Sequence, residues 1–286
     1  MNFNTKVRII SVIVLIFFPV FAFWQYQKIK PEPVIIVPRE EINVTIIPGW
    51  TLDNIADSWL SLGLVDNKEQ LFKILGAPQF IGKYDEGEKI DLAGEDAGDV
   101  FNILKTRPKD TTYEGYLIPD TYRVYKDSEI EDVLYKIFYN LDEKITVEML
   151  SEIKKQGKTF YEVLTMASVV EREAREYEDM KMVADIFWRR NEVNWALQSC
   201  ATVNYVTGKN SPAVSAQDKQ VDSLYNTYKY PGLPPGPIAN PSLNAIMATI
   251  YPKSNSYWYF MSGRDGAMHY AVDLDGHNTN VYKYLR

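Results

Sequence analysis

The sequence has few of the residues that build covalently linked or metal-held frameworks. It contains one cysteine, Cys200, so no disulfide can form within the chain. A zinc site built on thiolates needs several of them and is therefore disfavoured. Histidine is almost as scarce, with only His269 and His277. The sequence thus indicates neither a metal site nor a cofactor.

An excess of positive charge is also missing. The chain has 31 Lys and Arg against 38 Asp and Glu, for a net charge of −7. Binding of nucleic acid phosphates requires a basic surface, so we do not expect a nucleic acid partner. The 46% hydrophobic and 24% charged residues are typical of a folded globular protein. A length of 286 residues suits one large domain or two modest ones.

Only one long apolar run is present, and it lies at the N-terminus. Ile9–Trp24 is sixteen residues without a charge, preceded by Lys6 and Arg8. A cleaved signal peptide is the alternative, but bulky residues end the run where a small-residue cleavage pattern is expected. We therefore expect residues 1–29 to form a cytoplasmic tip and a single membrane-spanning helix in the cell (inner) membrane. The preceding basic residues place everything after residue 30 outside the cytoplasm.

A proline-punctuated stalk and a small folded unit follow this run. Residues 30–40 contain several prolines and favour an extended stalk. Residues 41–109 begin with an alternating strand and continue with two amphipathic helices. The helices carry a capping residue before and a glycine after them: Thr51 and Gly63, then Asn67 and Gly76. This order, closed by a returning strand, resembles the LysM carbohydrate-binding module, and a structural spacer of the same shape is the alternative.

Residues 110–286 predict a larger mixed α+β domain. Capping boxes at Ser128 and Thr159 open two amphipathic helices, and Asn240 with a following proline predicts the start of another. The apolar segments "YWYFMS" and "HYAVDL" predict a terminal β-hairpin. Helices and short strands without regular βαβ alternation indicate the α+β class for the whole folded part.

Two glutamates interrupt the apolar stripe of the helix that begins after Thr159. On a helical wheel both Glu171 and Glu173 border the buried face, on opposite sides of it. A carboxyl at the edge of apolar packing loses solvation, which raises its pKa and suits it to act as a general acid. The alternative is an ordinary solvated edge, with Glu171 paired to Arg175 four residues on. The wheel alone does not choose between the two glutamates.

Five segments of the sequence favour a catalytic glutamate over an ordinary solvated one. They are "EGYLIPDTY", "ASVVERE", "LQSCATVNY", "YNTYKYPGLPPGPIANPSLNAI" and "YFMSGRDGAMHYAVDLDGHN". Together they closely resemble the endolytic murein transglycosylase family, the YceG-like (MltG) proteins, over nearly the whole chain. The resemblance implies a membrane-anchored enzyme that cuts peptidoglycan strands internally and leaves 1,6-anhydro-MurNAc ends. It also implies that Glu171 is the general acid and Glu173 a supporting residue.

The chain departs from the family pattern at two places. Cys200 and Ala201 stand where members carry Asp-Pro, which puts a supporting role for that aspartate in doubt. Gly276 stands where a glutamate is usual, directly before His277 and Asn278.

Other polar and aromatic residues are candidates for substrate binding or support. Glu114 could bind substrate or hold Glu171 in place, and tyrosine rings suit the apolar faces of sugars. The candidates are Glu114, Tyr122, Gln198, Ser199, Thr202, Tyr225, Asn226, Tyr228, His277 and Asn278. We expect peptidoglycan glycan strands and the membrane as partners, together with peptidoglycan synthases. Two other functions remain open: a non-catalytic peptidoglycan-binding scaffold for cell-wall synthases, and a glycoside hydrolase that uses water.

Overall fold

The computed structural model describes residues 23–27, 38–81, 101–211 and 214–285. The chain divides into two units, residues 1–39 and 40–286. In the first unit, residues 23–27 form one short helix. The predicted membrane helix at 9–24 lies almost entirely outside the described residues. None of the helices in the described ranges combines the length and the apolar character that a bilayer span requires.

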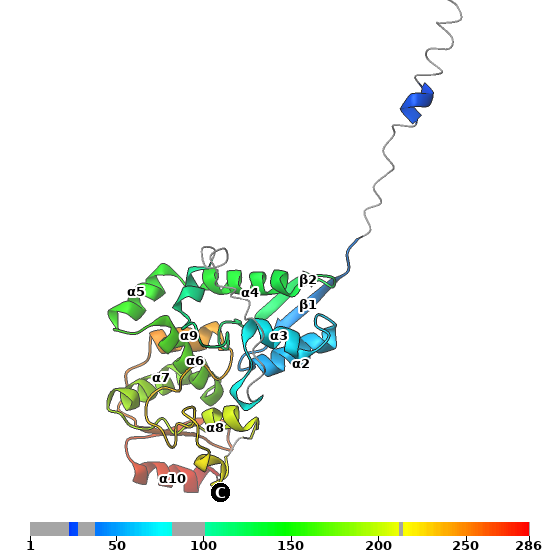
Figure 1. Ribbon diagram of the computed structural model, residues 1–286. Coiled ribbons are helices and arrows are strands. Elements are labelled where there is room, and N and C mark those ends of the chain that lie inside the picture. The colour runs from blue at the N-terminus through cyan, green and yellow to red at the C-terminus, as the bar shows by residue number, and fades with distance from the viewer. Residues whose placement is uncertain (1–22, 28–37, 82–100, 212–213, 286) are drawn as a thin grey trace, which may run out of the picture. The chain divides into compact units, whose positions relative to one another are not determined.

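The second unit confirms the α+β class. Its described part contains two separate two-stranded antiparallel sheets among helices (Figure 1). The strands are β1 (Glu41–Ile46), β2 (Asp120–Tyr125), β3 (Tyr259–Ser262) and β4 (Met268–Ala271). The α-helices are α2 (Leu52–Leu62), α3 (Lys68–Leu75), α4 (Ile130–Lys144), α5 (Val147–Lys155), α6 (Phe160–Glu173), α7 (Tyr177–Glu192), α8 (Cys200–Thr207), α9 (Leu243–Ile250) and α10 (Leu274–Leu285). Short 3-10 turns lie at Gln79–Ile81, Asn102–Thr106 and Asp218–Gln220.

The first sheet joins the start of the folded unit to a strand well along the chain. β1 pairs with β2 from Glu41 opposite Tyr125 to Ile46 opposite Asp120. Val44 and Ile46 are buried while their neighbours face outward, as the strand's two-residue period requires. The order strand–helix–helix–strand is therefore present, but its second strand comes after residue 110. The division at 109/110 and the likeness to a LysM module stay predictions.

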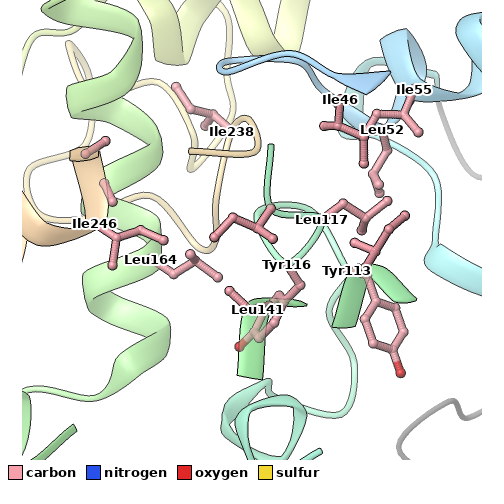
Figure 2. Packing of buried hydrophobic residues seen from close by; sticks show 14 of the residues in the cluster. Ile46, Leu52, Ile55, Tyr113, Tyr116, Leu117, Leu141, Leu164, Ile238 and Ile246 are labelled. Carbon is pink, nitrogen blue, oxygen red and sulfur yellow. The ribbon is translucent and has the colours of Figure 1, made fainter. Parts of the chain in front are cut away.

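Helix α6 lies at the centre of the helical part. It packs against α5, α7, α8 and α9. Its residues from Val163 to Val170 are all buried. Figure 2 shows Leu164 of α6 near Ile246 of α9, with Leu117 between them and the cluster of Ile46 and Leu52. These residues belong to one continuous apolar core, so α6 is held rigidly on nearly all sides.

The helix boundaries confirm some of the predicted caps and correct others. Thr51 caps α2, Asn67 caps α3, and Thr159 forms the expected capping box with Glu162. The box predicted at Ser128 is wrong, because α4 begins after Glu129 and has no side-chain cap.

The predicted start of α9 at Asn240 is also wrong. The cap of α9 is Ser242, whose side chain accepts a hydrogen bond from the Ala245 N–H. Asn240 lies two residues before this cap, and its side chain bonds to other partners.

The C-terminal hairpin β3–β4 is confirmed. Helices α7, α8 and α10 were not predicted from the sequence patterns. Helix α10 packs on both strands of the hairpin and carries His277.

Candidate active site

Glu171 lies in the last turn of α6, where the helix leaves the core. Its side chain is half-buried. One carboxylate oxygen, Oε2, accepts hydrogen bonds from the Ser242 backbone N–H at 2.9 Å and the Ser242 hydroxyl at 2.6 Å. Burial raises the pKa of Glu171, against the Ser242 hydrogen bonds and the charge of Arg172, which lower it. The net rise in pKa means that this carboxyl keeps a proton to higher pH than a solvated glutamate does.

The turn between β1 and α2 lies against this glutamate. A methyl group at Gly49 would lie 3.8 Å from Cγ of Glu171 and 3.3 Å from Cδ of Arg172. Arg172 also donates to the Gly49 carbonyl at 3.1 Å. Glycine fits here because φ is +79° and because the helix end leaves little room for a side chain. A segment from the first fifty residues therefore borders the candidate acid.

Glu173, the second glutamate of the stripe, faces a different neighbour. Its Oε1 accepts a hydrogen bond from the Ser199 hydroxyl, and the Ala201 N–H also bonds to the carboxyl. It thus sits at the N-terminus of α8, whose dipole favours a negative charge. Burial raises its pKa, and the two hydrogen bonds with the charges of Arg172 and Arg190 oppose that rise.

Glu114 is fully enclosed and binds three separate parts of the chain. It is 1% exposed. Oε1 accepts from the Leu52 N–H and from Nδ2 of Asn240, both at 3.0 Å, and the Tyr205 hydroxyl lies 3.5 Å from Oε2. Burial raises the pKa of Glu114 to about 8. Its contacts are all with protein groups, so it acts as an internal brace and caps the N-terminus of α2.

The segment that replaces the family's Asp-Pro lies beside Glu173. Cys200 is half-buried, and its Sγ is 3.1 Å from the Tyr228 hydroxyl. Just before it, Gln198 has an exposed side chain and a φ of +57°. A non-glycine residue in this left-handed region costs backbone energy, and such residues concentrate at functional sites.

Three candidates are engaged in internal structure. The Tyr122 hydroxyl donates to the Ile118 carbonyl at 2.6 Å and accepts from an α4 side chain. Thr202 is fully buried and its hydroxyl is 2.9 Å from that of Thr227. The Asn226 amide donates to two loop carbonyls and accepts from a backbone N–H. Tyr122 thus joins β2 to α4, whereas Thr202 and Asn226 hold the loop of residues 219–227 beside α8.

The remaining candidates Tyr225, His277 and Asn278 make no hydrogen bond or ion pair with Glu171 or Glu173 in the described part of the chain. Tyr225 is half-buried, and its ring centroid is 5.1 Å from that of Tyr205. His277 stacks on Tyr259 at 5.5 Å, and its Nδ1 is buried with no hydrogen-bond partner in the described chain. Burial and the charge of Arg190 lower the pKa of His277. Asn278 is exposed.

Sequence reasoning missed three residues that organise this region: Ser242, Asn240 in its observed role, and Arg190. Ser242 could have been found, because the apolar periodicity of α9 begins at the next residue and serine is a strong capping residue. Arg190 is 5% exposed and donates to the Leu197 and Trp258 carbonyls. A single arginine in a helix gives no sign in the sequence that it will be buried.

The described residues show no group of three or more His, Cys, Asp or Glu side chains placed to hold a metal ion. The candidate site consists of carboxyl groups with raised pKa values beside hydroxyl, amide and aromatic side chains.

The fold and this group of residues define an α+β protein with two half-buried glutamates at one helix end. Residues 27–283 match the model of the YceG-like family, and the chain belongs to that family. It is 34% identical over 243 residues to a Bacillus subtilis protein and 33% identical over 258 residues to one from Streptococcus pneumoniae, both named endolytic murein transglycosylase. These alignments cover 85% and 87% of this chain. The chain spans 65% of the first relative's length and 46% of the second's.

A solved structure agrees with the family assignment. The crystal structure of a yceG-like protein from Listeria monocytogenes is 31% identical, with a TM-score of 0.69. The match covers 83% of this chain and 74% of that one.

Proposed function

We propose that the protein is an endolytic lytic transglycosylase that cleaves the MurNAc-β-1,4-GlcNAc bond of peptidoglycan and leaves 1,6-anhydro-MurNAc ends. Its family membership and the names of its relatives support this activity. The observation that carries the proposal is Glu171, a half-buried carboxyl with a raised pKa, whose hydrogen bonds from the described residues reach Oε2 alone. Such cuts would terminate or trim glycan strands.

One carboxyl group suffices for this reaction. Protonated Glu171 gives its proton to the glycosidic O4, and the C1–O4 bond breaks as an oxocarbenium-like centre forms. The resulting carboxylate takes the proton of the C6 hydroxyl on the same muramyl sugar, and O6 bonds to C1. Because the nucleophile belongs to the substrate, its effective concentration is very high. A second carboxylate to activate water is not needed.

The structure offers a physical reason to prefer Glu171 over Glu173 as the acid. Glu173 is bound by the Ser199 hydroxyl and the Ala201 N–H and lies near two arginines, so its carboxyl is directed at protein groups. Within the described residues, the hydrogen bonds to Glu171 reach Oε2 alone, so Oε1 has room for a proton and a substrate oxygen. We assign Glu173 the role of holding the Ser199 loop in place.

Substrate contacts are proposed for the candidates with exposed or half-buried surface. Gln198 presents its side chain from a strained backbone, and Tyr225 and Tyr228 offer aromatic faces to sugars. His277 and Asn278 would border the proposed sugar-binding surface formed by Gln198, Tyr225 and Tyr228. Glu114, Tyr122, Ser199, Thr202 and Asn226 would act indirectly, by shaping the loops.

The cellular setting is also part of the proposal. An uncleaved N-terminal anchor would hold the chain in the cell (inner) membrane, with residues after 30 outside the cytoplasm. A LysM-like unit at 41–109 would then bind glycan and bring strands to Glu171. Peptidoglycan synthases, which make the strands, are the proposed protein partners.

Product analysis tests the activity directly. Purified peptidoglycan is digested with the full-length protein, and the new chain ends are identified by mass spectrometry. We expect anhydro-muramyl ends, their loss in Glu171→Gln, and their retention in Glu173→Gln. Reducing ends would instead indicate a hydrolase, and no new ends would indicate a binding scaffold. Loss of cleavage in Glu173→Gln with full activity in Glu171→Gln would reverse the assignment of the acid.

A further inference from the structure

Ser242 makes three hydrogen bonds that together fix the direction of its hydroxyl. The Ala245 N–H donates to Oγ at 3.2 Å, as expected of a helix cap. The same Oγ lies 2.6 Å from Oε2 of Glu171, and the Ser242 N–H lies 2.9 Å from it. Because Ala245 uses an acceptor site of Oγ, the hydroxyl proton is free to point at the carboxylate. Both donors of Ser242 therefore converge on one oxygen of Glu171.

This arrangement favours the ionised form of Glu171. Two hydrogen bonds to a carboxylate oxygen stabilise its negative charge, and the adjacent N-terminus of α9 adds a favourable dipole. The charge of Arg172 works in the same direction. Burial works in the opposite direction. The reaction needs both forms, the acid for the first half and the carboxylate for the second.

Asn240 fixes the chain two residues before Ser242. It is fully buried, and its Oδ1 accepts from the Gly115 and Leu117 N–H groups at 2.9 and 3.0 Å. Its Nδ2 donates to the Trp50 carbonyl and to Glu114, each at 3.0 Å. All four hydrogen-bonding sites of this side chain are used. The segment leading into Ser242 is thus bound to two other parts of the chain.

We propose that Ser242 is a positioning residue that stabilises the carboxylate of Glu171 for the base half of the reaction, and that Asn240 holds Ser242 in the required place. The proposal rests on the proposed role of Glu171 and adds two residues to it. Ser242 holds one oxygen of the carboxyl, so the other is presented to the glycosidic oxygen and then to the C6 hydroxyl. Neither residue contacts the substrate itself.

The test compares Ser242→Ala with Ser242→Thr, which keeps a capping hydroxyl. Thr146→Ala is the matched control, because Thr146 caps α5 in the same way but does not contact Glu171. Anhydro-end formation by the full-length protein is measured from pH 4 to 9 at saturating and low substrate. We expect Ser242→Ala to lower kcat about tenfold or more with little change in KM, since a hydrogen bond to a charged group is lost. Ser242→Thr should recover most of that loss, and Thr146→Ala should match wild type.

The pH profile supplies a readout that a merely structural role would not change. Loss of a donor to the carboxylate raises the pKa of Glu171, so the fall in activity at high pH should move to higher pH in Ser242→Ala. Titration of Glu171 by carbon-13 NMR, with Glu171→Gln to assign the signal, should show the same direction without any substrate.

The outcomes separate this inference from the proposed function. If wild type forms anhydro ends and Glu171→Gln does not, the function stands. The inference is then overturned if the high-pH limb and the NMR titration of Ser242→Ala coincide with those of Thr146→Ala. If wild type forms no anhydro ends, the function fails, and the NMR comparison alone still decides whether Ser242 stabilises the carboxylate.

Discussion

Replacement of Glu114 by glutamine should make the protein more stable at neutral pH. Burial raises the pKa of Glu114 from its ordinary value of 4.5 to about 8. Between these values the folded protein keeps a proton that the unfolded chain releases, so the free energy of unfolding falls as pH rises. The slope for one proton is about 1.4 kcal/mol per pH unit, which gives a loss of about 3 kcal/mol between pH 5 and pH 7.5. The loss is complete once pH passes the folded pKa.

Glutamine can make the contacts of the protonated acid without this cost. Nδ2 of Asn240 and the Leu52 N–H both donate to Oε1 at 3.0 Å, and an amide oxygen accepts both hydrogen bonds. The Leu52 N–H also lies 3.2 Å from Oε2, so an amide nitrogen there gives up this weaker contact, at a cost that does not change with pH. The amide nitrogen would take the place of the protonated oxygen near the Tyr205 hydroxyl. Glu114→Gln should therefore lack the contribution of this group to the pH dependence.

Urea unfolding at several pH values measures the effect. The difference between Glu114→Gln and wild type should grow by about 3 kcal/mol from pH 5 to pH 7.5. Taking the difference cancels the titration of other groups, including Glu171 and Glu173. A difference between Glu114→Gln and wild type that stays constant over this range would show that Glu114 is ionised in the folded protein, and the reasoning would be refuted.

Three further predictions concern stability and can be checked by urea unfolding. Gly115→Ala should cost about 2–4 kcal/mol, because φ is +89° and the added methyl would lie 2.7 Å from a proline ring atom; Gly63→Ala, with open space around it, should cost about 1 kcal/mol. Thr159→Ala removes a capping box and should cost about 1 kcal/mol, whereas Ser128→Ala should cost less than about 0.5 kcal/mol because Ser128 caps no helix. Asn240→Ala leaves several buried groups unpaired and should cost about 3 kcal/mol or more. These assignments would be contradicted if Gly115→Ala were as stable as Gly63→Ala, or Thr159→Ala as stable as Ser128→Ala. An Asn240→Ala protein as stable as wild type would contradict the role of Asn240.

The predicted elements that proved correct are those in which local signals agree. Helix α2 has a capping threonine, an apolar face and a terminal glycine, and all three predict the same boundaries. For α9 the local signals conflict, because both Asn240 and Ser242 are good capping residues. The choice between them is made by tertiary contacts, since Asn240 is needed to bridge the Trp50 and Gly115 segments.

The candidate site could be located from sequence but not assembled from it. The helical wheel places both glutamates at the border of the buried face of α6, and the structure finds both half-buried. It does not reveal that Glu171 meets Ser242, seventy-one positions along the chain, or that Glu173 meets Ser199. Such pairings depend on how α6, α8 and α9 pack, which no local pattern encodes. The identity of the acid therefore stays a prediction from the family resemblance and the chemistry of its surroundings.

The bonds between the β1–α2 turn and Asn240 limit how this protein can be shortened. The Gly49 N–H donates to the Asn240 carbonyl at 2.9 Å, and the Asn240 N–H donates to the Trp50 carbonyl at 2.7 Å. Excising residues 41–109 would remove both partners and leave β2 without the strand it pairs with. The Asn240 side chain also donates to the Trp50 carbonyl, so exchange of residues 41–109 between homologues should succeed only when the turn at residues 49–50 and the segment around Asn240 come from the same protein.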